Sequence, residues 1–357
     1  MAGTADTEEA LGAPCAGRSV WRGGELADRP ERWTLRLSPP QLAEIDAAAR
    51  EARRRDLTLL RLTAADFPLP TLAPELDRVA EELEYGRGFT LVRGVPVERL
   101  GEPAASTVFW GLGRHLGRPV PQTAYGDMLG HVRDTGRGPA DPATRGHQTR
   151  DALPFHTDRA DLLALLCLRP PRSGGRVSLV SAAAVHNAVL ALRPDLAERL
   201  YRTYHFDRRE EHAPGEPPWT AAPLVVRRGE AVSMMYDRRC LESAQRFPRV
   251  PRLRPADTEL FDLVDEVAAA PGLRLDIDLR AGDLLLLNTH AVLYARGAFE
   301  DHERPGLRSH QLRLWLARPD TDGTREGVTP HDVIRPRDTR PRDTPARSAA
   351  GPRRRRG

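Results

Sequence analysis

Residues 162–168 form an apolar run that ends at the sequence Pro-Pro-Arg-Ser-Gly-Gly, residues 170–175. A short apolar run bounded by Pro and Gly is typical of a strand in a buried sheet. The residues just before this run read Phe-His-Thr-Asp, residues 155–158. Side chains at positions i and i+2 of a strand point to the same face. We therefore expect His156 and Asp158 side by side on the edge of a sheet.

An imidazole and a carboxylate arranged in this way are candidate metal ligands. Two His and one carboxylate on one face of Fe(II) leave positions open for a co-substrate and oxygen. His-x-Asp arises easily by chance in a chain with eleven His, and a hydrogen-bonded structural His is the alternative. A second His-x-Asp, at residues 205–207, precedes a charged cluster instead of an apolar run, so the first motif is favoured.

A candidate third ligand lies at the end of another apolar run. Residues 284–287 are four Leu, they follow a Gly-Asp turn, and they lead to Asn-Thr-His at 288–290. A single His at a strand end is more often a hydrogen-bonded core residue than a ligand. Together with His156 and Asp158, however, His290 completes a candidate set of two His and one carboxylate.

The composition excludes some function classes. All 54 basic residues are Arg, so lysine Schiff-base chemistry is excluded. The net charge of +4 depends largely on the Arg-rich C-terminal stretch, so it does not indicate a nucleic-acid-binding domain. The three Cys form no CxxC pair, which suits a reducing cytoplasm. No apolar run reaches the roughly 18 residues of a membrane span, and the acidic N-terminus is unlike a signal peptide.

The pattern of the chain predicts one domain between two irregular ends. We expect a loose N-terminal arm at 1–35, a single domain at 36–318, and a disordered Pro/Arg-rich tail at 319–357. Caps, Gly and Pro positions and apolar periodicity predict helices at 38–54, 73–85, 104–116, 182–192 and 255–270. Strands are expected at 89–94, 177–180, 224–226, 232–236, 273–279, 284–290 and 311–317.

Several short phrases, specific only in combination, resemble the taurine dioxygenase / clavaminate synthase-like family over about residues 80–318. They are Phe-His-Thr-Asp at 155–158, Leu-Leu-Cys-Leu-Arg-Pro at 165–170, Ser-Gly-Gly at 173–175, Val-His-Asn-Ala at 185–188, Ser-Ala-Gln-Arg at 243–246, Asn-Thr-His at 288–290, Ala-Arg at 295–296 and Leu-Arg-Leu-Trp-Leu at 312–316. The resemblance implies a mainly β fold with flanking helices, whose core is a double-stranded β-helix, or jelly roll.

The resemblance also implies a function. It predicts an Fe(II)- and 2-oxoglutarate-dependent dioxygenase that uses O2, hydroxylates a C–H bond of a small molecule and releases succinate and CO2. Specialised biosynthesis is the expected setting. Asp158 is a carboxylate where halogenases of this kind have a small residue that opens a chloride site, so it favours hydroxylation. Desaturation, epoxidation and cyclisation would use the same site and stay open.

The distal carboxylate of 2-oxoglutarate requires a cation, best supplied by Arg. The family places this Arg after the distal His, which leaves Arg313 and Arg308 as candidates. Arg313 is favoured because positions 309, 311 and 313 share one strand face, although many relatives have Arg where this chain has Ser309. Ser178 or Ser181 is a candidate hydrogen-bond donor to the same carboxylate.

Residues 126–150 are expected to form a long polar loop before the ligand strand. Arg133, His147 and Gln148 in this loop, and Tyr236 beyond it, are candidates for contact with substrate. Two other functions stay open: a non-catalytic jelly-roll protein that binds a metal or ligand, and a nucleic-acid binder that uses the Arg-rich tail. The sequence contains no signal that fixes an oligomeric state.

Overall fold

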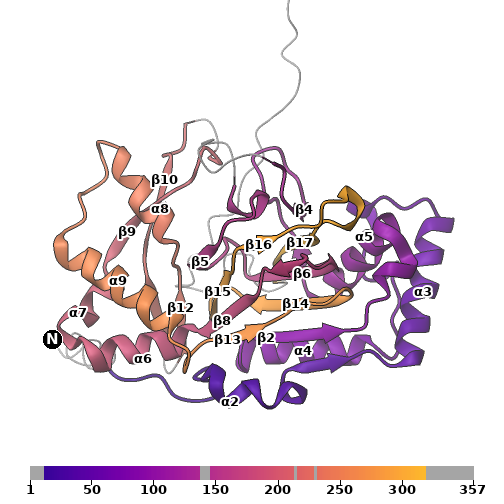
Figure 1. Ribbon diagram of the computed structural model, residues 1–357, viewed down its shortest axis with the longest axis horizontal. Coiled ribbons are helices and arrows are strands. Elements are labelled where there is room, and N and C mark those ends of the chain that lie inside the picture. The colour runs from indigo at the N-terminus through magenta and orange to yellow at the C-terminus, as the bar shows by residue number, and fades with distance from the viewer. Residues whose placement is uncertain (1–11, 137–144, 213–214, 229–230, 319–357) are drawn as a thin grey trace, which may run out of the picture.

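A computed structural model describes residues 12–136, 145–212, 215–228 and 231–318 of the 357-residue chain (Figure 1). Its centre is a pair of stacked β-sheets, and helices cover the outer face of each sheet. The helices are α2 (Gly23–Ala27), α3 (Pro39–Arg54), α4 (Ala73–Tyr85), α5 (Val97–Leu116), α6 (Ala182–Leu192), α7 (Pro194–Ala197), α8 (Arg238–Ser243) and α9 (Pro255–Ala269).

The larger sheet has seven strands, in the order β1-β2-β14-β6-β17-β3, with β4 also paired to β17. Only β1 and β2 are parallel; the other neighbours are antiparallel. The strands are β1 (Thr34–Arg36), β2 (Phe89–Arg93), β3 (Arg118–Pro119), β4 (Leu129–Val132), β6 (Leu162–Arg169), β14 (Asp283–Asn288) and β17 (His310–Ala317).

The smaller sheet is antiparallel and has the order β13-β8-β15-β5. Its strands are β5 (Leu153–His156), β8 (Val177–Ser181), β13 (Leu275–Ile277) and β15 (Val292–Arg296). Three short two-stranded pairs lie outside the two sheets: β7 (Ser173–Gly174) with β16 (Phe299–Glu300), β9 (Thr203–Asp207) with β10 (Trp219–Pro223), and β11 (Val225–Arg228) with β12 (Ala231–Met234).

Alternate residues of each strand point to different cores, as the two-residue period of a strand requires. On β6, Leu163 and Leu165 pack between the sheets, against residues of the smaller sheet such as Leu179. Ala164 and Leu166 point the other way, toward the helices that cover the larger sheet. Because β6 is buried on both faces, its sequence is a continuous apolar run without alternation.

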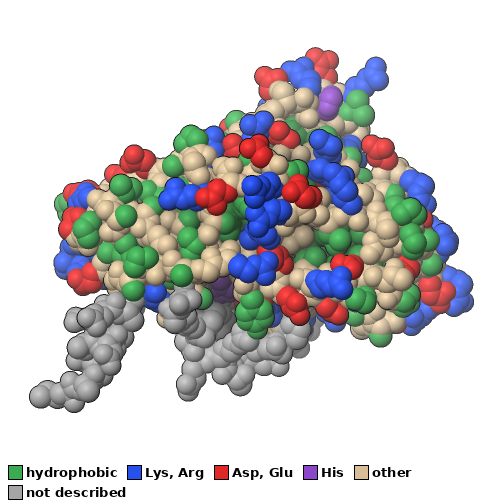
Figure 2. All heavy atoms as spheres, turned by 90° about the horizontal axis from the view of Figure 1, so that it is seen from below, with side chains coloured by type: hydrophobic (Ala, Val, Ile, Leu, Met, Phe, Trp, Pro, Cys, Tyr) green, Lys and Arg blue, Asp and Glu red, His purple; other side chains and the backbone are tan. Residues whose placement is uncertain are grey.

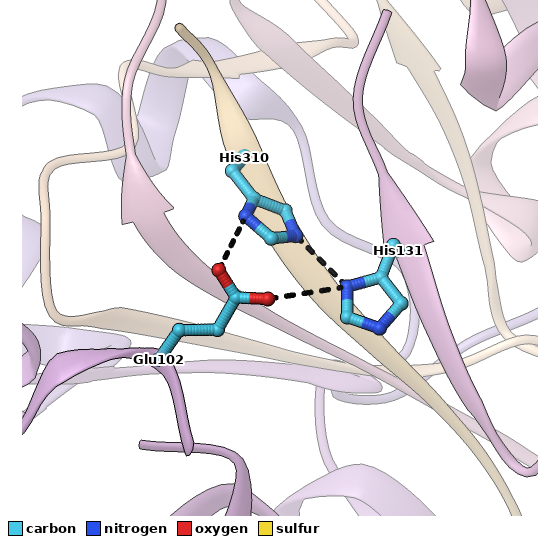
Figure 3. Close-up of side chains that lie close together, drawn as sticks. All are labelled: Glu102, His131 and His310. Carbon is cyan, nitrogen blue, oxygen red and sulfur yellow. Dashed lines mark hydrogen bonds and ion pairs between the residues drawn. The ribbon is translucent and has the colours of Figure 1, made fainter. Parts of the chain in front are cut away.

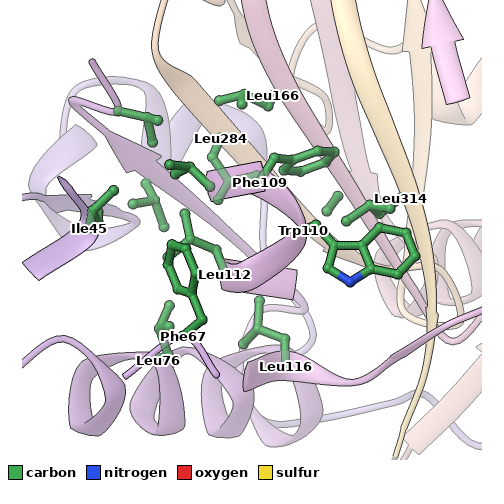
Figure 4. Packing of buried hydrophobic residues seen from close by; sticks show 14 of the residues in the cluster. Ile45, Phe67, Leu76, Phe109, Trp110, Leu112, Leu116, Leu166, Leu284 and Leu314 are labelled. Atoms are coloured by element: carbon green, nitrogen blue, oxygen red, sulfur yellow. The ribbon is translucent and has the colours of Figure 1, made fainter. Parts of the chain in front are cut away.

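Helices α3, α4 and α5 cover the outer face of the larger sheet (Figure 4). Phe67, Phe109 and Leu112 are buried there together with the outward Leu residues of β6, β14 and β17. A Cβ at Gly111 would lie 2.5 Å from the Phe67 ring, so glycine allows this close approach to α5. On the other side, α6 and α9 pack on the outer face of the smaller sheet.

The predicted fold is confirmed, with two open sheets forming the jelly-roll core. The predicted helices at 38–54, 73–85, 182–192 and 255–270 match α3, α4, α6 and α9 closely. The Ser38 cap is also present, since the Ser38 amide donates to the Gln41 side chain at 2.9 Å. These helices were predictable because their ends carry Pro, Ser or Gly at positions with a local physical role.

Four expectations differ from the structure. The long loop expected at 126–150 contains β4, which pairs with β17 of the larger sheet. Residues 12–35, expected to be loose, contain α2 and the start of β1, and they bury Trp21 and Trp33 against Phe89. The strand expected at 284–290 ends at Asn288, so His290 lies in the following turn. A strand not predicted, β15, begins directly after that turn. The predicted disordered tail lies outside the described residues.

Charged side chains of both signs are interspersed on the face seen in Figure 2, with hydrophobic side chains between them. Within the described part of the chain, no helix combines the length and apolar character that a membrane crossing needs.

Candidate functional site

His156 lies at the end of β5, where the smaller sheet ends and the chain turns. Its Nδ1 contacts the Pro154 carbonyl oxygen at 2.8 Å. A ring that donates from Nδ1 to a carbonyl keeps its lone pair on Nε2, which is the usual arrangement in a metal-binding His. His156 Nε2 lies 4.0 Å from Asp158 Oδ1. The expected side-by-side placement of this imidazole and carboxylate is therefore present.

The turn between these two residues is held by Tyr236. The Thr157 amide donates to the Tyr236 carbonyl at 2.8 Å, and the Tyr236 amide donates to Thr157 Oγ1 at 3.1 Å. The Tyr236 side chain is fully buried, and its hydroxyl donates to Asp265 Oδ1 at 2.8 Å. Tyr236, a candidate for substrate contact, thus has its hydroxyl in the core and its backbone against the ligand turn.

Asp158 is buried and receives two hydrogen bonds on one oxygen. Trp315 Nε1 donates to Asp158 Oδ2 at 2.9 Å, and the Tyr294 hydroxyl donates to the same oxygen at 3.1 Å. Trp315 comes from β17 of the larger sheet and Tyr294 from β15 of the smaller one. Both sheets therefore orient this carboxylate, and its Oδ1 is the oxygen nearer to His156.

Tyr294 is the residue of β15 that pairs with His156 across the smaller sheet. The two rings are 4.4 Å apart between centroids. Burial, followed by the nearby Asp158 charge, raises the pKa of the Tyr294 phenol well above its usual value. Tyr294 was not among the predicted site residues. A five-residue apolar run shortly before Gly297 was the signal for its strand.

His290 has other partners in the structure. Its Nδ1 lies 2.8 Å from Ser233 Oγ, and its Nε2 lies 3.1 Å from Asp161 Oδ1. Among the described residues, His156, Asp158 and His290 do not form a group with ligand atoms all within 4.8 Å of one another. The structure thus brings His156 and Asp158 together, and His290 as their partner stays a prediction.

The described residues contain one group of three His or carboxylate side chains that meets that distance: Glu102, His131 and His310 (Figure 3). His131 Nδ1 lies 2.9 Å from His310 Nε2, and His310 Nδ1 lies 3.4 Å from Glu102 Oε2. Arg169 Nη2 is also 3.2 Å from His310 Nδ1, and a guanidinium at that distance opposes cation binding. We interpret this group as a hydrogen-bonded contact among α5, β4 and β17.

Arg313 lies on the inner face of β17, 8% exposed, on the same face as Trp315. Its guanidinium lies over the Trp315 ring, 5.0 Å from the centroid, and its Nε donates to Gln122 Oε1 at 2.7 Å. Because Trp315 also binds Asp158, a buried cation lies beside the His156–Asp158 pair. Arg313 therefore has the environment expected of the 2-oxoglutarate Arg.

The other candidates for 2-oxoglutarate lie elsewhere. Arg308 is exposed and contacts the His302 carbonyl. Ser178 pairs with Ala295, so it faces away from Tyr294, and its hydroxyl donates to Asp276 at 2.6 Å. The Ser181 hydroxyl donates to the Ser19 carbonyl. None of these contacts involves the residues around Arg313.

The segment before β5 is tied to the site by Arg296, two positions beyond Tyr294. Arg296 Nη2 donates to the Thr149 and Asp151 carbonyls at 2.8 and 2.7 Å. His147 lies in this segment, where burial and then the Arg313, Arg145 and Arg296 charges lower its pKa to about 2. His147 is thus neutral and near Arg313.

The two other loop candidates differ in position. The Gln148 side chain accepts from the Arg145 amide at 3.0 Å, so it closes the local turn. Arg133 is exposed, and its charge, after burial, lowers the pKa of His131. Arg133 directly follows β4, two residues after His131. Residues 137–144 of the long loop lie outside the described residues.

The family model for taurine catabolism dioxygenases TauD and TfdA matches residues 53–315. The chain belongs to the TauD/TfdA dioxygenase family. It is 33% identical over 317 residues to FR-33289 synthase of Streptomyces rubellomurinus, covering 86% of this chain and 91% of that protein. It is also 28% identical to the taurine hydroxylase-like protein SAT17 of Stachybotrys chartarum, covering 83% and 77%.

Solved structures of other oxygenases have the same fold. An asparagine oxygenase in complex with Fe(II), 3-hydroxyasparagine and succinate aligns with a TM-score of 0.63 at 16% identity, covering 80% of this chain and 93% of that one. The non-heme iron oxygenase OrfP with iron and α-ketoglutaric acid aligns with a TM-score of 0.61 at 18% identity, covering 79% and 93%.

TauD/TfdA membership confirms the predicted enzyme class: an Fe(II)- and 2-oxoglutarate-dependent dioxygenase acting on a small molecule with O2. The residues present fit these groups. The lone pair of His156 Nε2 and the Oδ1 of Asp158 suit Fe(II), and the buried Arg313 guanidinium suits a carboxylate. Gln122, which orients Arg313, had no sequence signal beyond its residue type. Trp315, which orients Asp158, lies two positions after Arg313 in a predicted strand, so the two-residue period placed it on the same face as Arg313.

Proposed function

We propose that this enzyme hydroxylates a C–H bond of a small molecule that carries an anionic group. In this proposal His156 and Asp158 hold Fe(II), and Arg313 binds the distal carboxylate of 2-oxoglutarate. The observation that carries it is the position of Trp315, which contacts Asp158 through its Nε1 and Arg313 through its ring face. The two proposed iron ligands, His156 and Asp158, are thereby held next to the Arg313 guanidinium on the inner faces of both sheets.

The bound iron and co-substrate supply the oxidising chemistry, and the side chains position the participants. Trp315 and Tyr294 hold the Asp158 carboxylate by its Oδ2. Gln122 holds the Arg313 guanidinium. Arg296 holds the segment before β5 through the carbonyls of Thr149 and Asp151.

Positive charge near the loop before β5 supports an anionic substrate. His147 is surrounded by the charges of Arg313, Arg145, Arg296 and Arg209. Arg239 lies next to Gly146 in the same region and is half-exposed. One relative, at 27% identity, is named uridine-5'-phosphate dioxygenase, and its named substrate is an anion. We assign substrate contact to His147 and Arg239. The three buried free cysteines suit a reducing cytoplasm as the location.

The test is coupled turnover of 2-oxoglutarate with matched pairs of small molecules that differ only in an anionic group. We expect succinate and a product heavier by one oxygen from the anionic member of a pair. Arg239→Gln should raise KM for that substrate by about 10-fold, as expected when one charged hydrogen bond is lost. Equal turnover of the neutral and anionic members would contradict the anionic-substrate proposal.

A further inference from the structure

Tyr294 is the side chain that meets both His156 and Asp158. Its ring lies 4.4 Å from the His156 ring, and its hydroxyl is 3.1 Å from Asp158 Oδ2. We propose that Tyr294 is, through its phenolic oxygen, the third protein ligand of the iron, beside His156 and Asp158. This inference rests on the proposed function, since it refines the iron site on which that function depends.

The spacing of the oxygens fits a shared metal. Two oxygen ligands about 2.1 Å from a metal and at right angles are about 3 Å apart. The Tyr294 phenolic oxygen and Asp158 Oδ2 are already at about that separation, linked by the phenolic proton, and Oδ1 of the same carboxylate faces His156. A metal that replaces this proton bonds to the phenolate oxygen, and the proton passes to solvent. Asp158 Oδ2 keeps its second donor, Trp315 Nε1, after the exchange.

The position of Tyr294 is fixed by regular structure. Tyr294 lies on β15, where it pairs with His156 on β5 and with Leu179 on β8, so strands on both sides hold it. It is 7% exposed and packs in the core between the sheets. A ligand on a central strand, held by neighbours on both sides, is well suited to a defined coordination geometry.

His290 is placed less favourably for the same role. It lies in a turn, two residues after β14 ends, and both ring nitrogens have partners, Ser233 and Asp161. To bind the iron it would have to give up the contact between Nε2 and Asp161. Tyr294 exchanges only a proton for the metal, and its backbone stays in place.

A phenolate ligand changes the properties of the iron. Phenolate is a hard, anionic oxygen donor, so it stabilises Fe(III) relative to Fe(II) more than a neutral imidazole does. Phenolate bound to Fe(III) also gives a ligand-to-metal charge-transfer band in the visible range, which imidazole and carboxylate ligands lack. This band separates Tyr294 from His290 without any measurement of turnover.

The experiment uses the full chain, stripped of metal and loaded with Fe(II) without oxygen. Bound iron is counted by mass spectrometry after desalting, and the sample is then oxidised with ferricyanide. We expect one iron per chain and a visible band whose resonance Raman spectrum contains phenolate modes. Tyr294→Phe should lose the band and weaken iron binding by at least about 10-fold. Tyr294→His should bind iron but give no band.

Two controls are matched to this design. Tyr204 is another buried Tyr whose hydroxyl donates to a carboxylate, Asp257, at 3.0 Å, so Tyr204→Phe should keep the band. His290→Ala should also keep it. Two outcomes would overturn the Tyr294 assignment and leave the proposed function standing. In the first, the wild type binds iron but gives no band. In the second, His290→Ala weakens iron binding and Tyr294→Phe does not. A wild-type chain that binds no iron would overturn both.

Discussion

Gln122 and Arg313 hold each other on the inner face of the larger sheet. Arg313 Nε donates to Gln122 Oε1 at 2.7 Å, and Gln122 Nε2 donates to the Arg313 carbonyl at 2.8 Å. The two residues are 191 positions apart in the chain. The contact fixes the guanidinium over Trp315 and leaves its Nη groups for another partner, which is the arrangement a carboxylate ligand requires.

Replacing Gln122 with Leu should therefore weaken 2-oxoglutarate binding without removing it. One hydrogen bond to a charged group contributes about 1.5–3 kcal/mol, so KM for 2-oxoglutarate should rise about 10- to 100-fold. Because Gln122 acts through Arg313, kcat at saturating 2-oxoglutarate should change little. Steady-state kinetics measure both values. A loss of kcat with no change in KM would show that Gln122 has a different role.

Removal of the Arg313 charge should have a larger effect. Arg313→Gln removes the guanidinium assigned to the distal carboxylate, and KM for 2-oxoglutarate should rise at least about 100-fold. Arg308→Gln is the matched variant, because Arg308 is exposed and lies outside this site. Its KM for 2-oxoglutarate should stay within about 2-fold of the wild-type value, since an exposed Arg contributes little to binding. The reverse pattern would move the co-substrate site to Arg308.

Trp315→Phe should lower the affinity for Fe(II). The change keeps an aromatic ring under Arg313 but removes the Nε1 donor to Asp158 Oδ2. Partners that orient a ligand are worth about 10- to 100-fold in metal affinity. Trp110→Phe is the comparison, because Trp110 Nε1 donates to the Leu62 carbonyl in the helical layer, away from the site. In an anaerobic titration, the affinity for Fe(II) should fall for Trp315→Phe and stay unchanged for Trp110→Phe.

The pH dependence of stability should depend on His310. Burial, together with the nearby His131 and Arg169 charges, lowers the pKa of His310 to about 4, whereas an unfolded His has a value of about 6.5. Between these two values the unfolded state binds the proton and the folded state does not. The contribution of His310 is complete above about pH 6.5 and is lost as the pH falls toward 4, by up to about 3 kcal/mol.

His310→Gln should flatten this dependence, since Gln has no proton to gain. Thermal unfolding of both proteins from about pH 7 to about pH 4.5 measures the difference. Over this pH range, the melting temperature of the wild type should fall more than that of the variant. Parallel curves would mean that His310 is not the group responsible.

The sequence predicted most of the core because its signals were local. The run at 162–168 is buried on both faces, so its lack of alternation was itself informative. The caps at Ser38 and Gly86 allowed the start of α3 and the end of α4 to be predicted to within one residue. His156 and Asp158 were found because two chemical groups two residues apart in a strand must share a face.

The rest of the site depends on contacts between distant parts of the chain. β15 is only five residues long and begins directly after the turn that contains His290, so its apolar run was not distinguished from the end of the preceding strand. Tyr294 is joined to His156 by sheet register, which no local pattern reports. Gln122 lies in a Pro-containing link whose sequence shows no periodicity, and only the folded chain brings it to Arg313.

The most direct test is the position of iron in a crystal, located from anomalous scattering at the iron absorption edge. We predict a peak within about 2.3 Å of His156 Nε2 and of the Asp158 carboxylate, between the two sheets. Two results would contradict the assignment of His156 and Asp158 as iron ligands. One is a peak only beside the Glu102–His131–His310 group, and the other is a peak beside His290 and Asp161 without a bond to His156.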